Sequence, residues 1–274
     1  MVIDSHVYFW KYNKEEYGWI NKNMKALQKD YLPADIKLTF ERNGVDGCVA
    51  VQSIPSFTET RFLAELANTH SFIKGVIGWA DLRSPQVGKN LDELKAYRAI
   101  KGIRHILQSE PDVLFYNQDF RRGIATLKEY GYTFDLLINA DQLKAASDLV
   151  AAFPDQVFIL DHAGKPDIKN KEINSWKAGI NELARYPNVY CKLSGLITEA
   201  EWKSWSPGDF YPYFDVIFKA FGADRLLYGS DWPVILLSGI YVQWKSMLEK
   251  YMEDYEDEDK QKIFGGNATL VYGI

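Results

Sequence analysis

The sequence predicts an α/β fold, a single (β/α)8 barrel over residues 1–274 in which a closed ring of parallel strands lies inside a ring of helices. Three observations predict it: eight short apolar segments recur, their apolar residues are continuous rather than alternating, and helical segments separate them. Continuous apolar strands are typical of a sheet buried on both faces. Strict alternation of strand and helix implies parallel strands joined by right-handed crossovers. A length of roughly 250 residues is typical of such a TIM barrel.

The predicted strands are short and rich in the β-branched and aromatic residues that strands prefer. They cover residues 2–6, 47–52, 72–82, 99–107, 132–138, 157–162, 188–193 and 225–231. An open doubly wound sheet is the alternative architecture. It would usually carry a glycine-rich phosphate-binding loop after the first strand. The segment DSHVYFW, which follows Ile3, has no glycine.

The predicted helices are recognised by their ends. Ser56 and Glu59 form a capping-box pattern that begins a helix, and Asn90 is expected to begin the next one by the same chemistry. Gly131 is a natural residue just beyond a helix end. The chain from residue 241 onward is also helical in pattern, with an acidic break near 253–259 that we interpret as a solvated turn. The barrel prediction therefore allows a C-terminal helical extension.

Composition and charge exclude several classes of protein. The 32 Lys and Arg against 37 Asp and Glu give a net charge of −5, without the clustered positive face that nucleic-acid binding requires. No apolar run approaches the roughly 20 residues needed to cross a bilayer, so no membrane partner is expected. Cys48 and Cys191 are expected to be buried free thiols, which agrees with a cytoplasmic protein. Nothing in the sequence predicts the oligomeric state.

Polar and aromatic residues gather at the carboxyl ends of the predicted strands, where barrel enzymes place their active sites. They are His6, Tyr8, Gln52, Trp79, Arg104, His105, Gln108, His162, Lys192, Asp231 and Trp232. Three of the four histidines in the chain belong to this set, which favours an enzyme. The long first loop, residues 11–32, is expected to fold over this end of the barrel.

Several of these residues also have a purely structural explanation. His6 could be a core histidine satisfied by backbone groups, and Lys192 could serve a buried ion pair. Arg104 and His105 are neighbours on one strand, so only one of them faces the barrel interior, and the choice stays open. Asp161 is expected to orient its neighbours through hydrogen bonds.

Five blocks of sequence stand out together within residues 3–272: IDSHVYFW, IRHILQ, LDHAGKP, CKLSGL and YGSDWPV. In these motifs the chain resembles the amidohydrolase-related TIM-barrel hydrolases, specifically the sugar-acid lactonases of the L-fuconolactonase and L-rhamnonolactonase types. The resemblance implies a hydrolase that opens a sugar-acid lactone such as a fucono- or rhamnono-lactone. Two other functions stay open: a metal-dependent amidohydrolase or decarboxylase of the same superfamily, and a barrel that binds a sugar acid without converting it.

The resemblance also implies roles for individual residues. Asp231 is the expected general base that takes a proton from water, while His6 and His162 are expected to polarise the lactone carbonyl, directly or through a metal. The candidates for contact with the ring oxygens or the leaving alkoxide are Arg104, His105 and Lys192. The candidates for substrate binding are Tyr8, Trp10, Gln52, Trp79, Gln108 and Trp232.

The first strand departs from the family pattern at the metal site. The family usually has His-x-His there, and this chain has His6-Val7-Tyr8. His6, His162 and Asp231 remain, and three such ligands with an open position can hold a catalytic zinc ion. Tyr8 is a poor fourth ligand, because a tyrosine phenol must lose a proton with a reference pKa of about 10. We therefore expect either no required cofactor or a weakly bound divalent metal, with zinc the best candidate.

Overall fold

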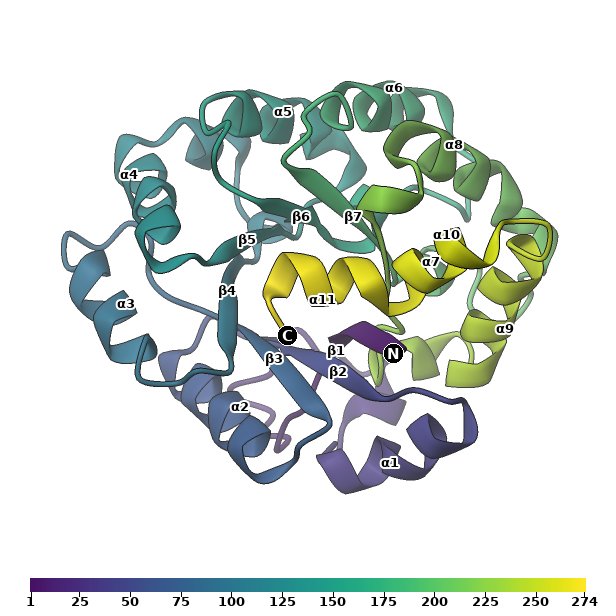
Figure 1. Ribbon diagram of the computed structural model, residues 1–274, viewed down its shortest axis with the longest axis horizontal. Helices are drawn as coiled ribbons and strands as arrows, with labels where there is room; N and C mark the ends of the chain where they lie inside the picture. The colour runs from purple at the N-terminus through teal and green to yellow at the C-terminus, as the bar shows by residue number, and fades with distance from the viewer.

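The computed structural model describes all 274 residues and contains one eight-stranded parallel sheet, with the strands in sequence order (Figure 1). The strands are β1 Ile3–Val7, β2 Gly47–Val51, β3 Ile73–Gly78, β4 Ile100–His105, β5 Thr133–Leu136, β6 Phe158–Leu160, β7 Val189–Leu193 and β8 Leu226–Tyr228. All eight predicted strands are confirmed; seven lie within the predicted ranges, and β1 extends one residue further, to Val7. The sheet curls into the predicted barrel.

The barrel closes between β1 and β8 near their carboxyl ends. Val7 and Trp232 form a parallel bridge, and the Tyr8 backbone N–H donates to the Trp232 carbonyl at 2.7 Å. The Asp231 N–H donates to the His6 carbonyl at 2.9 Å. The same closure therefore fixes His6, Tyr8 and Asp231 beside one another.

Helices cover the outside of the barrel, as Figure 1 shows. They are α1 Pro33–Arg42, α2 Phe57–Thr69, α3 Val87–Leu94, α4 Gln118–Leu127, α5 Leu143–Ala151, α6 Asn174–Leu183, α7 Leu196–Glu199, α8 Tyr211–Phe221, α9 Tyr241–Tyr251, α10 Asp257–Gln261 and α11 Asn267–Tyr272. The Ser56 hydroxyl accepts from the Glu59 N–H at 3.1 Å, which confirms the predicted cap of α2. The predicted cap at Asn90 is wrong: α3 begins a turn earlier, where Val87 joins Leu91 in its buried face.

The C-terminal helices lie across the amino-terminal end of the barrel (Figure 1). The Lys101 ammonium, near the start of β4, donates to the Gly273 carbonyl at 3.1 Å. Tyr272 is buried, and its hydroxyl donates to Asp135 on β5 at 3.3 Å. The predicted C-terminal extension is thus confirmed. No helix combines the length and the apolar character needed to span a bilayer.

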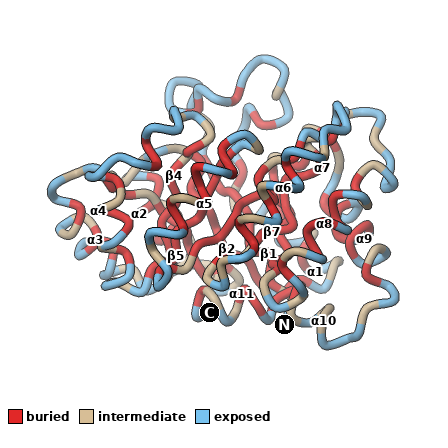
Figure 2. The backbone as a smooth tube through the Cα atoms, turned by 90° about the horizontal axis from the view of Figure 1, so that it is seen from above, coloured by how far each residue is buried: buried red, intermediate tan, exposed pale blue.

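One hydrophobic core joins the strands to the inner faces of the helices, while the loops and outer faces are exposed (Figure 2). Inside this core the barrel holds fully buried charged residues on its strands or directly after them: Asp4, Asp135, Asp161 and Lys192, with Arg104 1% exposed. Charged side chains are almost never fully buried unless they are paired. These residues mark the interior where polar chemistry is concentrated.

Asp4 should make the stability of the protein depend on pH. Its carboxylate is fully buried, and burial raises its pKa to about 6 even though Ser230, His6 and Tyr241 donate hydrogen bonds to it. The unfolded pKa is about 3.9, so the folded state binds this proton more tightly. The resulting stabilisation is fully present below about pH 4, and about 3 kcal/mol is lost as the pH rises past 6. Urea unfolding of the wild type and of Asp4→Asn between pH 4 and 7 measures this difference; parallel curves would contradict it.

Candidate active site

A cavity of about 780 Å³ opens at the carboxyl ends of the strands. Each of the eight strands, or the loop that follows it, contributes at least one lining residue: Tyr8, Ser53, Trp79, Arg104, Leu137, His162, Glu199 and Asp231, in strand order. The first loop also contributes Trp19 and Met24, which confirms that it folds over this end. Active sites of TIM barrels occupy this position.

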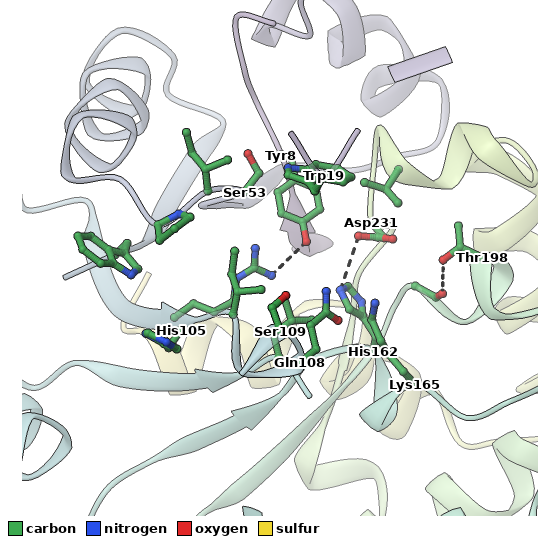
Figure 3. Close-up of a pocket in the computed structure, with 18 of the residues that line it drawn as sticks. Tyr8, Trp19, Ser53, His105, Gln108, Ser109, His162, Lys165, Thr198 and Asp231 are labelled. Carbon is green, nitrogen blue, oxygen red and sulfur yellow. Dashed lines mark hydrogen bonds and ion pairs between the residues drawn. The ribbon is translucent and has the colours of Figure 1, made fainter. Parts of the chain in front are cut away.

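Asp231 lies on the floor of the cavity beside His162 (Figure 3), and the buried His6 is its second histidine neighbour. Its Oδ1 is 3.9 Å from His6 Nε2 and 3.8 Å from His162 Nε2, and this buried oxygen has no hydrogen-bond partner. Burial raises the pKa of Asp231 well above its ordinary value, and Lys165 is the neighbouring charge that opposes this most. When ionised, Asp231 is therefore a stronger base than an exposed aspartate.

Both histidines are neutral in this environment. Burial lowers the pKa of His6 to about 3 and places the pKa of His162 well below its ordinary value. His162 Nδ1 lies 2.9 Å from the Ser194 hydroxyl, which orients the ring. Gly195 adopts φ 69°, and a Cβ at this position would collide with that ring. A glycine here lets the turn after β7 pack directly against His162.

Tyr8 and Arg104 form a second polar group at the floor. The Tyr8 hydroxyl lies 2.8 Å from His6 Nε2 and accepts a hydrogen bond from Arg104 Nη1 at 3.0 Å (Figure 3). The Arg104 guanidinium also lies over the Tyr8 ring, 5.2 Å from its centroid. Burial raises the pKa of Tyr8, so the phenol keeps its proton and can donate a hydrogen bond into the cavity.

A layer of buried ion pairs supports this floor from below. Asp161 accepts from Arg104 Nη1 at 3.0 Å and lies 3.0 Å from the Lys192 ammonium, which is 2.5 Å from Asp135. Burial by itself would raise the pKa of Asp161, yet Lys192, His6 and Arg104 hold it well below its ordinary value. Asp161 Oδ1 also lies 3.4 Å from His6 Nδ1 without a hydrogen bond, so the expected orienting hydrogen bond is the one from Arg104 to Oδ2.

The cavity brings together seven of the twelve predicted site residues. Those that line it are Tyr8, Trp79, Arg104, His105, Gln108, His162 and Asp231. His6 and Lys192 are fully buried in the barrel and are not among the lining residues. Gln52 is also fully buried. Its side-chain amide donates to the Arg104 backbone carbonyl at 3.1 Å, and the Gln52 backbone carbonyl accepts a hydrogen bond from the Arg104 guanidinium.

Trp10 and Trp232 lie outside the cavity wall. The Trp10 ring packs against Tyr31 with centroids 5.6 Å apart, and its N–H donates to the Lys29 carbonyl at 2.9 Å. Trp232 also packs against Tyr31, with the ring centroids 5.1 Å apart. Both tryptophans thus hold the loop over the barrel, and neither lines the cavity.

The structure separates the neighbours Arg104 and His105. Arg104 points into the barrel and joins Asp161 and Tyr8, whereas the His105 ring packs edge-on against Phe120 of α4 at 5.2 Å. His105 Nε2 is 3.4 Å from Glu110, and the ring borders the cavity away from Asp231 (Figure 3).

Sequence reasoning missed Asp135 and Lys165. Asp135 interrupts the apolar segment YTFDLLI, and an acid inside a buried strand signals a charged partner. Lys165 lines the cavity three residues after His162, within the LDHAGKP motif.

The donors on the floor fit a divalent metal in part. His6, Asp161 and His162 each place one ligand atom within 4.8 Å of the others. Asp161 is engaged by Arg104 and Lys192, so Asp231, whose Oδ1 is unpartnered, is the better carboxylate ligand beside the two neutral histidines. These residue types suit a three-ligand zinc site. The Tyr8 hydroxyl competes for His6 Nε2, which weakens that fit.

Comparison with known proteins places this geometry in a family. The chain matches the family described as Amidohydrolase over residues 3–274. It is 36% identical to an L-fucono-1,5-lactonase of Burkholderia multivorans, over 99% of this chain and 96% of that protein. It is 26% identical to an L-rhamnono-gamma-lactonase of Scheffersomyces stipitis, over 65% of this chain and 60% of that protein.

Solved structures agree. Crystal structures of an amidohydrolase from Burkholderia multivorans, one with bound HEPES and one with bound zinc, superpose with a TM-score of 0.96. Each is 36% identical and covers 100% of this chain and 99% of that chain. A putative 2-pyrone-4,6-dicarboxylic acid hydrolase from Pseudomonas putida, at 21% identity and TM-score 0.77, shares the fold. On these matches, the chain belongs to the amidohydrolase family.

Proposed function

We propose that this protein hydrolyses the lactone ring of a sugar acid, an aldono-lactone such as a fucono- or rhamnono-lactone. The observation that carries the proposal is the floor of the cavity: a buried carboxylate with an unpartnered oxygen beside two neutral histidines and a phenol hydrogen-bonded by Arg104. The 36% identity to an L-fucono-1,5-lactonase over 99% of the chain supports the substrate class. The free buried thiols of Cys48 and Cys191 support a reducing compartment, for which we propose the cytoplasm.

In the proposed reaction, Asp231 takes a proton from a water molecule that attacks the lactone carbonyl carbon. A general base works best when its pKa approaches the working pH, and burial moves the pKa of Asp231 in that direction. The Tyr8 hydroxyl, polarised by Arg104, donates a hydrogen bond to the carbonyl oxygen as negative charge develops there. One such donor is worth about 3 kcal/mol of transition-state stabilisation.

The charges around the cavity support a neutral substrate. Four acidic residues line it (Glu16, Glu110, Glu199 and Asp231) against three basic ones (Arg83, Arg104 and Lys165). Arg104 is already paired with Asp161 at 3.0 Å. A cavity built for a dicarboxylic acid would instead present an excess of available cations. A neutral polyhydroxylated lactone therefore fits this lining better than an anionic lactone.

A divalent metal, zinc in the first place, is proposed as a weakly held and dispensable partner of His6, His162 and Asp231. When bound there, it would act as a Lewis acid toward the lactone carbonyl. Lactones are activated esters, and the Tyr8–Arg104 pair already supplies a donor for the carbonyl oxygen.

Replacing Tyr8 with His should raise the affinity for zinc, by about tenfold or 1.4 kcal/mol, because an imidazole nitrogen is a better neutral ligand than a phenol. Titration calorimetry on metal-free protein measures the change. Tyr8→Phe is the matched control: it removes the hydroxyl that contacts His6 without adding a ligand, and no comparable gain is expected from it. An unchanged affinity in Tyr8→His would show that residue 8 does not occupy the metal position.

A panel of aldono-lactones, followed by acid release in a pH-stat with and without chelator, tests the proposed function. Hydrolysis that survives chelation is the expected result. If the protein instead acts on amides or aromatic acids, and only when it carries stoichiometric metal, a metal-dependent amidohydrolase or decarboxylase is favoured. Binding of sugar acids without acid release from any lactone would favour a non-catalytic barrel.

A further inference from the structure

The loop after β6 has a backbone conformation that L-amino acids rarely adopt. Four consecutive residues lie in the left-handed region: His162 at φ 53°, Ala163 at 48°, Gly164 at 67° and Lys165 at 49°. Three of them carry a Cβ, which approaches the following carbonyl oxygen in this conformation. Strain of this kind clusters at functional sites, where the surrounding structure enforces it. Such a turn is expected to hold a side chain in a position that the functional site requires.

The turn delivers two side chains to the same cavity. His162 and Lys165 both line it, and Figure 3 shows them side by side below Asp231. The Trp176 indole N–H donates to the Ala163 carbonyl at 2.8 Å and anchors the turn from outside. His162 has a place beside Asp231, whereas Lys165 has no role in the reaction described above. The conformation of residue 165 nevertheless brings an ammonium group to the site.

Of the two cavity cations nearest Asp231, Lys165 has weaker ion pairing than Arg104. Arg104 is held by Asp161, Tyr8 and the Gln52 carbonyl. The only carboxylate paired with the Lys165 ammonium is Glu199, at 3.6 Å, and both side chains are about one quarter exposed, at 23% and 26%. Its position is also close enough to Asp231 to oppose the rise in pKa that burial causes there. An ammonium group in this position is a proton donor that a ligand can reach.

We propose that Lys165 is the general acid of lactone opening and protonates the departing ring oxygen; this rests on the proposed function above. Water oxygen bonds to the carbonyl carbon and gives one proton to Asp231. The bond between that carbon and the ring oxygen then breaks, its electron pair stays on the ring oxygen, and the ring oxygen takes a proton from the Lys165 ammonium. The proton on Asp231 returns through water to the lysine amine, and the hydroxy acid product ionises in solvent.

The test compares two lactones whose leaving groups differ in their need for a proton. An alkoxide from an aldono-1,5-lactone needs a proton as it departs, whereas the phenolate from dihydrocoumarin, an aryl lactone, can depart without one. Lys165→Ala should therefore lower kcat/KM for the aldono-lactone by about 100-fold, the low end for general acid catalysis, and for dihydrocoumarin by less than about threefold. Lys169→Ala is the matched control: this lysine lies four residues further along, is 56% exposed and pairs with Glu201 at 2.8 Å.

Chemical rescue supplies a second measurement that does not require dihydrocoumarin to be a good substrate. Ethylammonium ions should restore part of the aldono-lactone activity of Lys165→Ala, because they supply the missing acid in the space left by the side chain. Equal losses on both substrates without rescue, or no loss on the aldono-lactone, would overturn the proposal for Lys165. Failure of the wild-type protein to hydrolyse any lactone would instead overturn the proposed function.

Discussion

Replacing Asp231 with Asn should lower kcat/KM for aldono-lactones by about 1000-fold, within the range of 10² to 10⁴ typical of a lost general base. That factor corresponds to about 4 kcal/mol of transition-state stabilisation. The amide keeps the shape of the carboxylate but cannot accept the proton of water. Steady-state hydrolysis in a pH-stat measures the loss, and a variant that retains full activity would refute the assignment of Asp231 as the base.

The fold of this variant is expected to survive, because the Asp231 Oδ1 that faces the histidines has no hydrogen-bond partner to lose. Asp119→Asn is a matched control, since Asp119 is 59% exposed and pairs only with Arg122 at the surface. The pH profile gives an independent check. Burial raises the pKa of Asp231, so wild-type activity should fall on the acid side at a pH above the ordinary range of aspartate. Residual activity of Asp231→Asn should lack that acid limb.

The sequence was sufficient to predict the barrel because burial on both faces leaves a local signal. Each strand is a continuous apolar run, and helices between them force parallel pairing. The same reasoning predicted where the candidate site lies, since the carboxyl ends of all strands meet at one end of the barrel, where His6, His162 and Asp231 are found. In the structure, Asp231 Oδ1 lies 3.9 Å from His6 Nε2 and 3.8 Å from His162 Nε2, as this topology allows.

The parts that could not be predicted depend on contacts between distant segments. Whether Trp10 faces substrate or supports the first loop is decided by Tyr31, twenty-one residues away, and not by the local pattern. Asp135 is a charged residue within an apolar strand and is therefore noticeable in the sequence, but its partner, Lys192, is 57 residues away. Lys165 was missed because a lysine in a loop is usually solvated, and only the left-handed turn directs it into the cavity.

Lys192 is fully buried beneath the candidate site and does not line the cavity. The charges beneath the floor are balanced: Asp135 and Asp161 face Lys192 and Arg104, all of them buried. Lys192 Nζ also lies 3.3 Å from His6 Nδ1. Since Lys192 does not line the cavity, we assign it to the positioning of His6 and Asp161 rather than to the ring oxygens.

Replacing Lys192 with Met should lower the free energy of unfolding by about 3–5 kcal/mol, the usual cost of removing one partner from a buried ion pair. The methionine fills much of the same volume, so the loss reports the unpaired carboxylates and not an empty space. Urea denaturation followed by circular dichroism measures it. The surface pair Lys128–Asp155, at 2.8 Å with both side chains at least 60% exposed, provides the matched comparison in Lys128→Met. Exposed pairs contribute about 0–1 kcal/mol, so a similar small loss in both variants would contradict a structural role for Lys192.

A double-mutant cycle with Asp135→Asn separates the ion pair from its surroundings. Burial raises the pKa of Asp135 to about 6, and Lys192 is the neighbour that most opposes this rise. Once Lys192 is gone, the Asp135 carboxylate is left with little compensation, so neutralising it should recover part of the stability. The double variant should therefore be more stable than the sum of the two single losses predicts, with a coupling free energy of about 1–3 kcal/mol. Strict additivity would mean that Asp161, and not Asp135, is the partner that holds Lys192 inside the barrel.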